Sequence, residues 1–152
     1  AAAWEAANAG QTGQTILTAF HADNAFDAYR RLVSMCHSAH TGLSDAHLLE
    51  MCVGAWPIMV FKKQLKDNSR KYMEIFEATG VENSRLQGRM LYRFVISATE
   101  RDGRGRVIKV RGSHQSVGTI SPELFCRLRD NGAPEAELLR LFPDACPEVI
   151  EK

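Results

Sequence analysis

The sequence predicts a mixed α/β fold in which helices precede and follow two β-hairpins. Apolar residues recur at helical spacing from Ala25 onward, whereas apolar and polar residues alternate in short runs after Pro57. Asp, Asn and Gly residues separate those runs, as is typical of tight turns. The composition, 45% hydrophobic and 24% charged, is that of an ordinary folded domain.

The first expected element is a strand over residues 15–20, TILTAF, which is a β-branched apolar run of the buried type. A polar turn with glycines at 10 and 13 precedes it, and the strand ends at His21. Asp23 or Asn24 then provides the N-cap of an amphipathic helix. Its apolar face consists of Ala25, Ala28, Tyr29, Leu32, Val33 and Cys36.

Residues 40–42, His-Thr-Gly, are expected to end this helix. Ser44 is a capping residue for a second helix that runs to Gly54. Two helices should therefore follow the first strand.

Two hairpins are predicted downstream. Residues 58–65 pair with 71–79, and residues 90–98 pair with 106–110 around an Asp-Gly-Arg-Gly turn. Residues 81–88 are mainly polar and are interpreted as a connector between the hairpins.

Two helices close the predicted fold. Ser121 is an N-cap residue with proline at the first helical position, and Asn131-Gly132 is a typical helix end. A last helix covers residues 134–141. We assign residues 1–80 to one part of the domain and residues 81–152, the second hairpin and helical extension, to another part packed on it.

Composition excludes several classes of protein. Nineteen Lys and Arg against eighteen Asp and Glu leave a net charge of +1, so no global field demands an anionic partner. The longest weakly polar run, residues 51–61, is shorter than the roughly 20 residues of a membrane-spanning helix. The N-terminus lacks a signal-peptide pattern, and the four cysteines form no C-x-x-C pair, so we expect a cytoplasmic protein with buried free thiols.

One stretch carries a specific motif. Residues 12–24, TGQTILTAFHADN, are followed by A-x-x-A-x-x-R-L over residues 25–32. This pattern resembles the histidine box of the bacterial secretion ATPase superfamily, which drives type II and type IV secretion, conjugation and type IV pilus assembly. The matching residues are Thr12, Gly13, Thr18, His21, Ala22, Asn24, Arg31 and Leu32, whereas Gln14 replaces the first histidine of the box.

A second block supports the same resemblance. Residues 60–75 are similar to the superfamily's downstream hairpin, V-x-x-x-x-L-x-D-G-x-R-x-V-x-x-I, in the form typical of the conjugation and tight-adherence pilus branch. Asp67 and Arg70 match, and Asn68 stands where glycine is usual, an exchange that a turn with positive φ tolerates. The two blocks together cover about half of the chain.

The resemblance implies the C-terminal portion of a RecA-like P-loop NTPase domain. Such motors hold ATP and Mg²⁺ with a G-x-x-x-x-G-K-[ST] loop and an acidic strand end upstream of the histidine box. This sequence contains neither, so the chain alone is expected to bind no cofactor and to hydrolyse no ATP. The implied partners are the upstream part of the same motor, further copies in a homo-hexamer, and an inner-membrane platform protein that holds the motor at the membrane from the cytoplasmic side.

The resemblance also assigns roles to individual residues. His21 would sense the γ-phosphate, Thr12, Gly13, Gln14 and Thr18 would lie near the nucleotide, and Arg31, Asp67 and Arg70 would make structural or subunit contacts. The residues alone leave other readings open. His21 can cap its own helix, Thr12 and Thr18 can fill turn and sheet positions, and Arg31 can form a salt bridge on its helix.

Two other clusters of residues carry side chains suited to binding. Cys36 and His40 share a helix face near His37, His47 and Cys52, but the spacing favours a buried thiol beside surface histidines over a metal site. Basic residues gather on both hairpins, and a solvated face or subunit contact is favoured over nucleic acid because aromatic residues are sparse there. The alternative function is a non-catalytic module that keeps the motor scaffold and binds protein or nucleic acid. The apolar run at residues 15–20 would expose a sheet edge unless another strand covers it.

Overall fold

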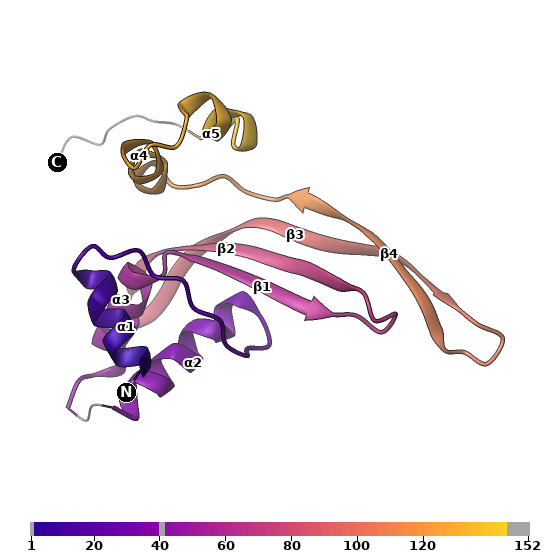
Figure 1. Ribbon diagram of the computed structural model, residues 1–152, viewed down its shortest axis with the longest axis horizontal. Coiled ribbons are helices and arrows are strands. Elements are labelled where there is room, and N and C mark those ends of the chain that lie inside the picture. The colour runs from indigo at the N-terminus through magenta and orange to yellow at the C-terminus, as the bar shows by residue number, and fades with distance from the viewer. Residues whose placement is uncertain (1, 40–41, 146–152) are drawn as a thin grey trace.

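The computed structural model describes residues 2–39 and 42–145 and confirms a mixed α/β fold (Figure 1). The described residues form five helices and a four-stranded sheet in which every neighbouring pair of strands is antiparallel. Helices α1 to α3 cover one face of this sheet, and α4 and α5 lie over the other face (Figure 1). None of the described helices is both long and apolar enough to cross a bilayer.

Helix α1 (Ala2–Gln11) was not expected from the sequence. It packs on α3 so closely that a Cβ atom at Gly10 would lie 2.6 Å from Cβ of Ala55. Gln11 adds a hydrogen bond of 3.1 Å from its side-chain amide to the carbonyl oxygen of Met51. The segment before the motif is therefore an integral part of the helical layer.

The two predicted helices after the motif are confirmed. Helix α2 (Ala25–His37) begins where the Asn24 side chain accepts a hydrogen bond of 2.7 Å from the amide of Asp27. Helix α3 (Asp45–Ala55) begins where Ser44 accepts from the amide of His47 at 3.2 Å. The predicted end of the first helix at residues 40–42 lies partly outside the described residues, and α2 itself ends at His37.

The predicted buried strand over residues 15–20 is wrong. This segment is extended but joins no strand of the described sheet, and Leu17 is 98% exposed. Only Ile16 and Phe20 pack against the core. The apolar composition is that of a strand, but a strand also requires a neighbour that pairs with its peptide groups, and no described segment supplies one.

The sheet is a simple meander of β1 (Ile58–Gln64), β2 (Arg70–Glu82), β3 (Arg85–Arg101) and β4 (Val107–Ser116). Both predicted hairpins are confirmed, but the connector expected over residues 81–88 is strand on both sides of a tight turn. Asn83 and Ser84 form that turn with φ values of 50° and 61°. The stretch looks like a loop in sequence because it lies at a solvated end of the sheet, where polar side chains are tolerated.

The sheet separates two apolar cores. Phe76 and Ala78 of β2 pack with helices α1 to α3, whereas Ile75 packs on the opposite face beside α4. Helix α4 (Pro122–Asp130) and α5 (Glu135–Leu141) cover Leu91 from that side. The alternation of side chains along one strand thus assigns each helical layer to its own face.

Two glutamates of β2 bind the helix layers to the sheet. On the α2 side, Glu74 accepts a hydrogen bond of 2.9 Å from the amide of Ala25. On the α4 side, buried Glu77 accepts from the Ser121 amide at 2.8 Å and from the Ser121 hydroxyl. Each carboxylate lies at the N-terminal end of a helix, where negative charge is favoured.

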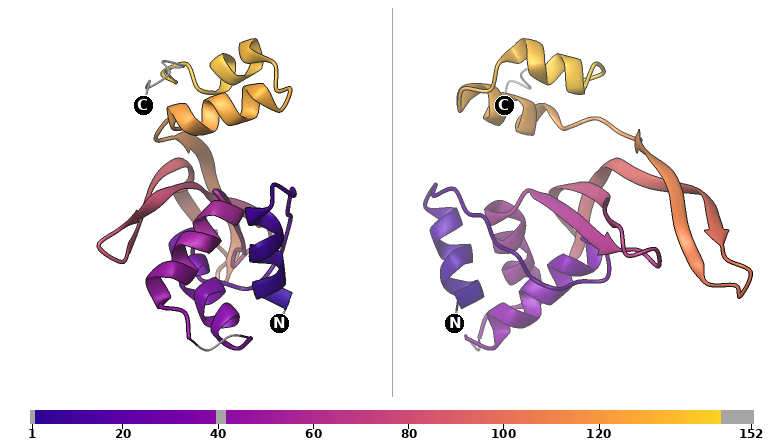
Figure 2. Two further views of the ribbon diagram at one scale, coloured as in Figure 1. Left: turned by 90° about the vertical axis from the view of Figure 1, so that its left-hand side faces the viewer. Right: turned by 45° about the vertical axis from the view of Figure 1, so that its right-hand side comes forward.

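Beyond the helices, the β3–β4 hairpin reaches past the β1–β2 turn (Figures 1 and 2). Arg101 and Val107 end the pairing at its tip, and Asp102 organises the turn by accepting hydrogen bonds from the amides of Arg104 and Arg106. This part of the sheet belongs to neither apolar core and is largely exposed.

Candidate functional site

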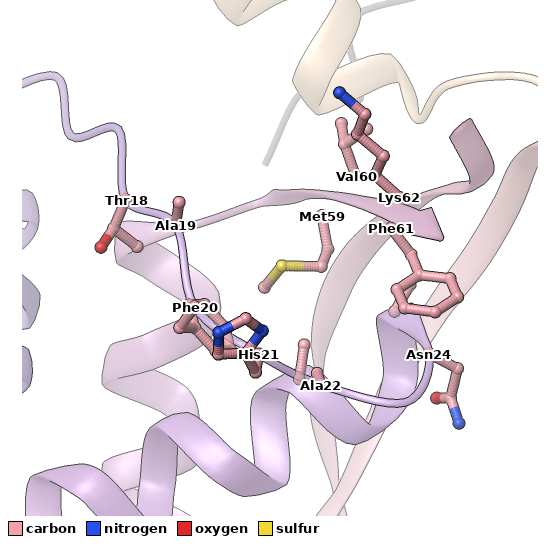
Figure 3. A pocket seen from close by; sticks show the side chains of 12 residues that line it. Thr18, Ala19, Phe20, His21, Ala22, Asn24, Met59, Val60, Phe61 and Lys62 are labelled. Carbon is pink, nitrogen blue, oxygen red and sulfur yellow. The ribbon is translucent and has the colours of Figure 1, made fainter. Parts of the chain in front are cut away.

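The segment that precedes α2, residues 18–24, and strand β1 enclose a small cavity, which we call the His21 cavity (Figure 3). Its volume is about 230 Å³. It is lined by Thr18, Ala19, Phe20, His21, Ala22, Asn24, Ala25, Ala28, Met59, Val60, Phe61 and Lys62. One side of the cavity is the unpaired segment before α2, and the other is the edge of β1 that pairs with no described strand.

Side chains of β1 alternate at the cavity. Met59 and Phe61 point toward the motif segment and α2, whereas Val60 and Lys62 point to the other side of the strand (Figure 3). Lys62 places its ammonium group over the ring of Tyr72, 5.3 Å from the ring centre. The Lys62 ammonium group therefore does not point toward His21.

His21 is exposed and makes no hydrogen bond or ion pair within the described residues. It does not cap helix α2, because Asn24 accepts the hydrogen bond from Asp27 and Glu74 accepts the one from Ala25. With its first amides already bound, α2 has little capacity left for a ligand at this end. The imidazole remains available at the rim of the cavity to a group that arrives from outside the described chain.

The other expected nucleotide-binding residues separate into two groups. Thr18 lines the same cavity as His21, although no direct contact joins them. Thr12, Gly13 and Gln14 lie outside the cavity, in the turn that follows α1. The hydroxyl of Thr12 donates to the carbonyl oxygen of Ala9 at 2.8 Å, and Gly13 adopts a φ of 86°, so both residues serve the helix end.

Arg31 lies exposed on α2, away from the His21 cavity. It forms no ion pair within the described part of the chain, whereas its neighbour Arg30 pairs with Asp27 at 3.5 Å. Arg31 is therefore free for a contact with another molecule, and the salt bridge expected on its own helix is absent from the described residues.

Asp67 and Arg70 lie at the β1–β2 turn, at the far end of β1 from Pro57. Asp67 accepts hydrogen bonds from the amide of Ser69 at 3.0 Å, from its hydroxyl at 2.7 Å, and from the amide of Val110 in β4 at 2.7 Å. These donors lower the pKa of the Asp67 carboxyl, the Ser69 hydroxyl most strongly. Asp67 thus connects the β1–β2 turn to β4, while Arg70 is exposed at the start of β2.

Sequence reasoning missed Glu74, which holds α2 beside the site, and Glu77, which holds α4 on the opposite face of the sheet. A carboxylate within an otherwise alternating apolar strand is the signal that could have identified them, since a buried acid requires hydrogen-bond donors. The partner could not be read from the sequence, because the donors lie 49 and 44 residues away.

The cysteine and histidine cluster is structural among the described residues. Cys36 and Cys52 are fully buried free thiols on facing helices, and burial raises the pKa of both. His37 bonds to Asp45 at 2.6 Å on the surface. No group of three metal-binding side chains occurs among the residues with defined positions, and His40 lies outside them.

The His21 cavity by itself does not fit a magnesium nucleotide. Its volume is below the range of about 300–1,000 Å³ that small-molecule pockets span. Its lining contains no Asp or Glu to hold Mg²⁺ and no glycine-rich loop to surround phosphates. The described residues can offer an imidazole and a hydroxyl to an anion but cannot enclose a whole nucleotide.

Comparison with known proteins gives no independent assignment. No protein-family model matches the sequence, and no curated protein matches it.

Proposed function

We propose that this chain is the C-terminal portion of the RecA-like motor domain of an ATPase that powers bacterial secretion, conjugation or pilus assembly. The motif of residues 12–32 and the hairpin of residues 60–75 motivate the proposal. The observation that carries it is the position of His21, at the rim of a cavity between an unpaired extended segment and an unpaired edge of β1.

Two walls of that cavity have backbone groups that pair with no strand among the described residues. Residues 15–21 are extended without strand pairing, and β1 pairs on one side only. A further strand running between these walls would satisfy peptide groups on both of them and cover Leu17. In the proposed motor, that strand belongs to the upstream segment, which also carries the phosphate-binding loop.

In the proposed motor, the upstream segment and this chain have different roles. ATP, held with Mg²⁺ by the upstream segment, supplies the phosphoryl group that is transferred to water. His21 donates a hydrogen bond to the terminal phosphate from the rim of the cavity, and Thr18 donates a second one from its hydroxyl. Charge on the imidazole strengthens such a bond, because donors that carry charge bind anions more strongly.

The proposed assembly is a cytoplasmic homo-hexamer docked on an inner-membrane platform protein. Exposed Arg31 and Arg70, which have no ion-pair partner within the described residues, are suited to contacts between subunits. These partners extend the resemblance and are part of the proposal.

The test uses both the chain and the full open reading frame that encodes it. Isothermal titration of the chain with Mg²⁺ and ATP should show no binding in the micromolar range. The full-length product should contain a G-x-x-x-x-G-K-[ST] loop upstream and hydrolyse ATP, and His21→Ala should reduce its kcat by about 10²-fold or more, the scale of removing a transition-state donor.

Arg30→Ala provides the matched control, since Arg30 lies on the surface of α2 outside the cavity. Micromolar ATP affinity of the chain alone, or an open reading frame without the loop, would overturn the proposal.

A second function is favoured by the charge of the hairpins. Lys63, Lys66 and Lys109 are exposed and have no carboxylate partner within the described part. An interaction module that keeps the motor scaffold without its catalysis would use this surface. Salt-dependent retention of the chain on DNA would favour its nucleic-acid form, and no retention at low salt would exclude that form.

A further inference from the structure

Another hollow lies between the end of the β1–β2 hairpin and the β3–β4 hairpin, and we call it the hairpin groove. Its volume is about 340 Å³. It is lined by Lys63 and Gln64 at the end of β1, by Leu65 and Lys66 in the turn that follows, and by Ile96, Thr99, Arg101, Val107 and Val110 of β3 and β4. It shares no lining residue with the His21 cavity, so an inference about it stands apart from the ATPase proposal.

Hydrogen bonds between side chains and the backbone hold the walls of the groove together. The Asp67 carboxylate accepts the amide of Val110 at 2.7 Å and thereby joins the β1–β2 turn to β4. Nearer the core, the His114 ring of β4 contacts the carbonyl oxygen of Tyr72 in β2 at 3.0 Å. The groove is therefore a formed feature of the sheet.

Positive charge at the groove is not compensated within the described chain. Lys63, Lys66 and Arg101 line it, and no Asp or Glu does. Lys63 also stands directly opposite Lys71 in the β1–β2 ladder. Like charges at opposed positions destabilise a sheet, so this arrangement gains from an anionic partner.

The acidic residues near the groove are already committed to internal bonds. Asp67 binds Ser69 and Val110, and Glu100 forms an ion pair with Arg111. The third, Asp102, accepts amides of its own turn and lies 3.8 Å from the guanidinium of Arg106. None of these carboxylates neutralises the lysines of the rim.

The apolar part of the lining narrows the chemistry of the partner. It is aliphatic, with Leu65, Ile96, Val107 and Val110, and contains no aromatic ring. Surfaces that bind single-stranded nucleic acid rely on aromatic rings for base stacking, which this groove lacks. Aliphatic side chains flanked by carboxylates match both the apolar lining and the cationic rim.

We propose that the hairpin groove binds a short acidic, aliphatic peptide segment of a partner protein. Carboxylates of the segment pair with Lys63, Lys66 and Arg101, while its aliphatic side chains cover Ile96 and Val107. Because the site is open and its cations are exposed, the affinity comes from several weak contacts and decreases with ionic strength.

The test measures fluorescence anisotropy with a labelled synthetic peptide of alternating glutamate and leucine. The chain should bind it saturably, and should bind peptides with lysine in place of glutamate, or serine in place of leucine, much more weakly. Lys66→Glu should weaken binding by about fivefold or more, because it turns an attraction into a repulsion.

Lys109→Glu is the matched control, since it makes the same change of charge on β4 outside the groove lining. Circular dichroism should show both variants folded, as both side chains are exposed. The proposal fails if the glutamate–leucine peptide does not bind, or if both variants lose binding equally.

The same variants separate the other classes of partner. Binding of duplex or single-stranded DNA that depends on Lys66, without peptide binding, would assign the groove to nucleic acid. Binding of vesicles rich in anionic phospholipid, with the same dependence and again without the peptide, would assign it to a membrane surface. Either result would overturn the peptide proposal.

Discussion

At the scale of single residues, Asp67 has the most clearly defined electrostatic environment. Its carboxylate accepts hydrogen bonds from the hydroxyl and amide of Ser69 and from the amide of Val110. These donors stabilise the charged form and lower the pKa of Asp67 from its ordinary value of 3.8. The contribution to stability is therefore complete above pH 3.8 and is lost as the pH falls through the lower folded-state pKa.

Asp67→Asn should accordingly destabilise the protein at neutral pH, and its difference from the wild type should shrink as the pH falls below the ordinary value of 3.8. Urea unfolding at a series of pH values measures this difference. Asp23→Asn is the control, because Asp23 is exposed and makes no hydrogen bond or ion pair within the described residues. A difference that does not change with pH would contradict the role given to the Asp67 charge.

Tyr29 is the second residue with a sharp prediction. It is fully buried, and its hydroxyl donates to the carbonyl oxygen of Trp56. Tyr29→Phe keeps the ring packed on Phe76 but leaves that carbonyl unpaired, so it should cost about 1–3 kcal/mol in free energy of unfolding. Tyr72→Phe, at an exposed ring, should change the free energy little.

Alkaline pH provides an independent check on Tyr29. Burial, with the nearby Cys52 and Glu77, raises the pKa of Tyr29 above its ordinary value of 10.0. The raised pKa means that the stabilisation is present below pH 10.0 and is lost at higher pH. The wild type should therefore lose its advantage over Tyr29→Phe as the pH rises above this value, and a constant advantage would contradict the burial of the hydroxyl.

At the scale of elements, hydrogen-bonding side chains made helix starts predictable. Asn24, Ser44 and Ser121 all cap the helices assigned to them, because a cap depends on the few residues that follow it in sequence. Residues 15–20 were misassigned because strand pairing depends on a neighbour that the local sequence does not specify. At the candidate site, Thr18 and His21 line the same cavity as β1, whereas Thr12, Gly13 and Gln14 lie in the turn after α1. Tertiary packing determines this arrangement, so the local sequence did not predict it.

At Gly10 of helix α1, the helix propensity of alanine and the close packing against α3 have opposite effects on stability. Replacing a helical glycine by alanine ordinarily stabilises a helix by about 1 kcal/mol. At Gly10 the added Cβ would lie 2.6 Å from Cβ and 2.8 Å from Cα of Ala55. Gly10→Ala should therefore destabilise the protein by about 1–3 kcal/mol, the usual cost of overpacking.

Thermal or urea unfolding gives the sign of the Gly10→Ala effect. The double variant Gly10→Ala with Ala55→Gly should recover part of the loss, because it removes the closer of the two contacts. Stabilisation by Gly10→Ala alone would mean that α1 does not pack on α3 as described.

At the scale of the whole molecule, apolar surface gathers beside the unpaired edge. Leu17 is 98% exposed, and Val60 of β1 is 49% exposed. Unpaired strands with exposed apolar side chains favour association with other chains. In the proposed motor this surface is covered by the upstream segment, so the chain alone should associate with itself as its concentration rises.

Leu17→Lys should reduce this self-association without lowering the unfolding temperature, because the Leu17 side chain is almost fully exposed in the folded chain. Sedimentation velocity over a concentration series measures the effect. Leu141→Lys introduces the same charge at a leucine of α5 that is 45% exposed, and it should leave association unchanged. Equal effects of the two substitutions would mean that association does not use the motif segment.

Glu74 and Glu77 of β2 also determine where the chain can accept inserted or deleted residues. Glu74 reaches α2 on one face and Glu77 reaches α4 on the other, so one added residue between them would turn one carboxylate toward the wrong layer. An added residue in the exposed turn around Gly103 would disturb neither layer. Insertions and deletions should therefore be tolerated at the tip of the β3–β4 hairpin and eliminated from the middle of β2.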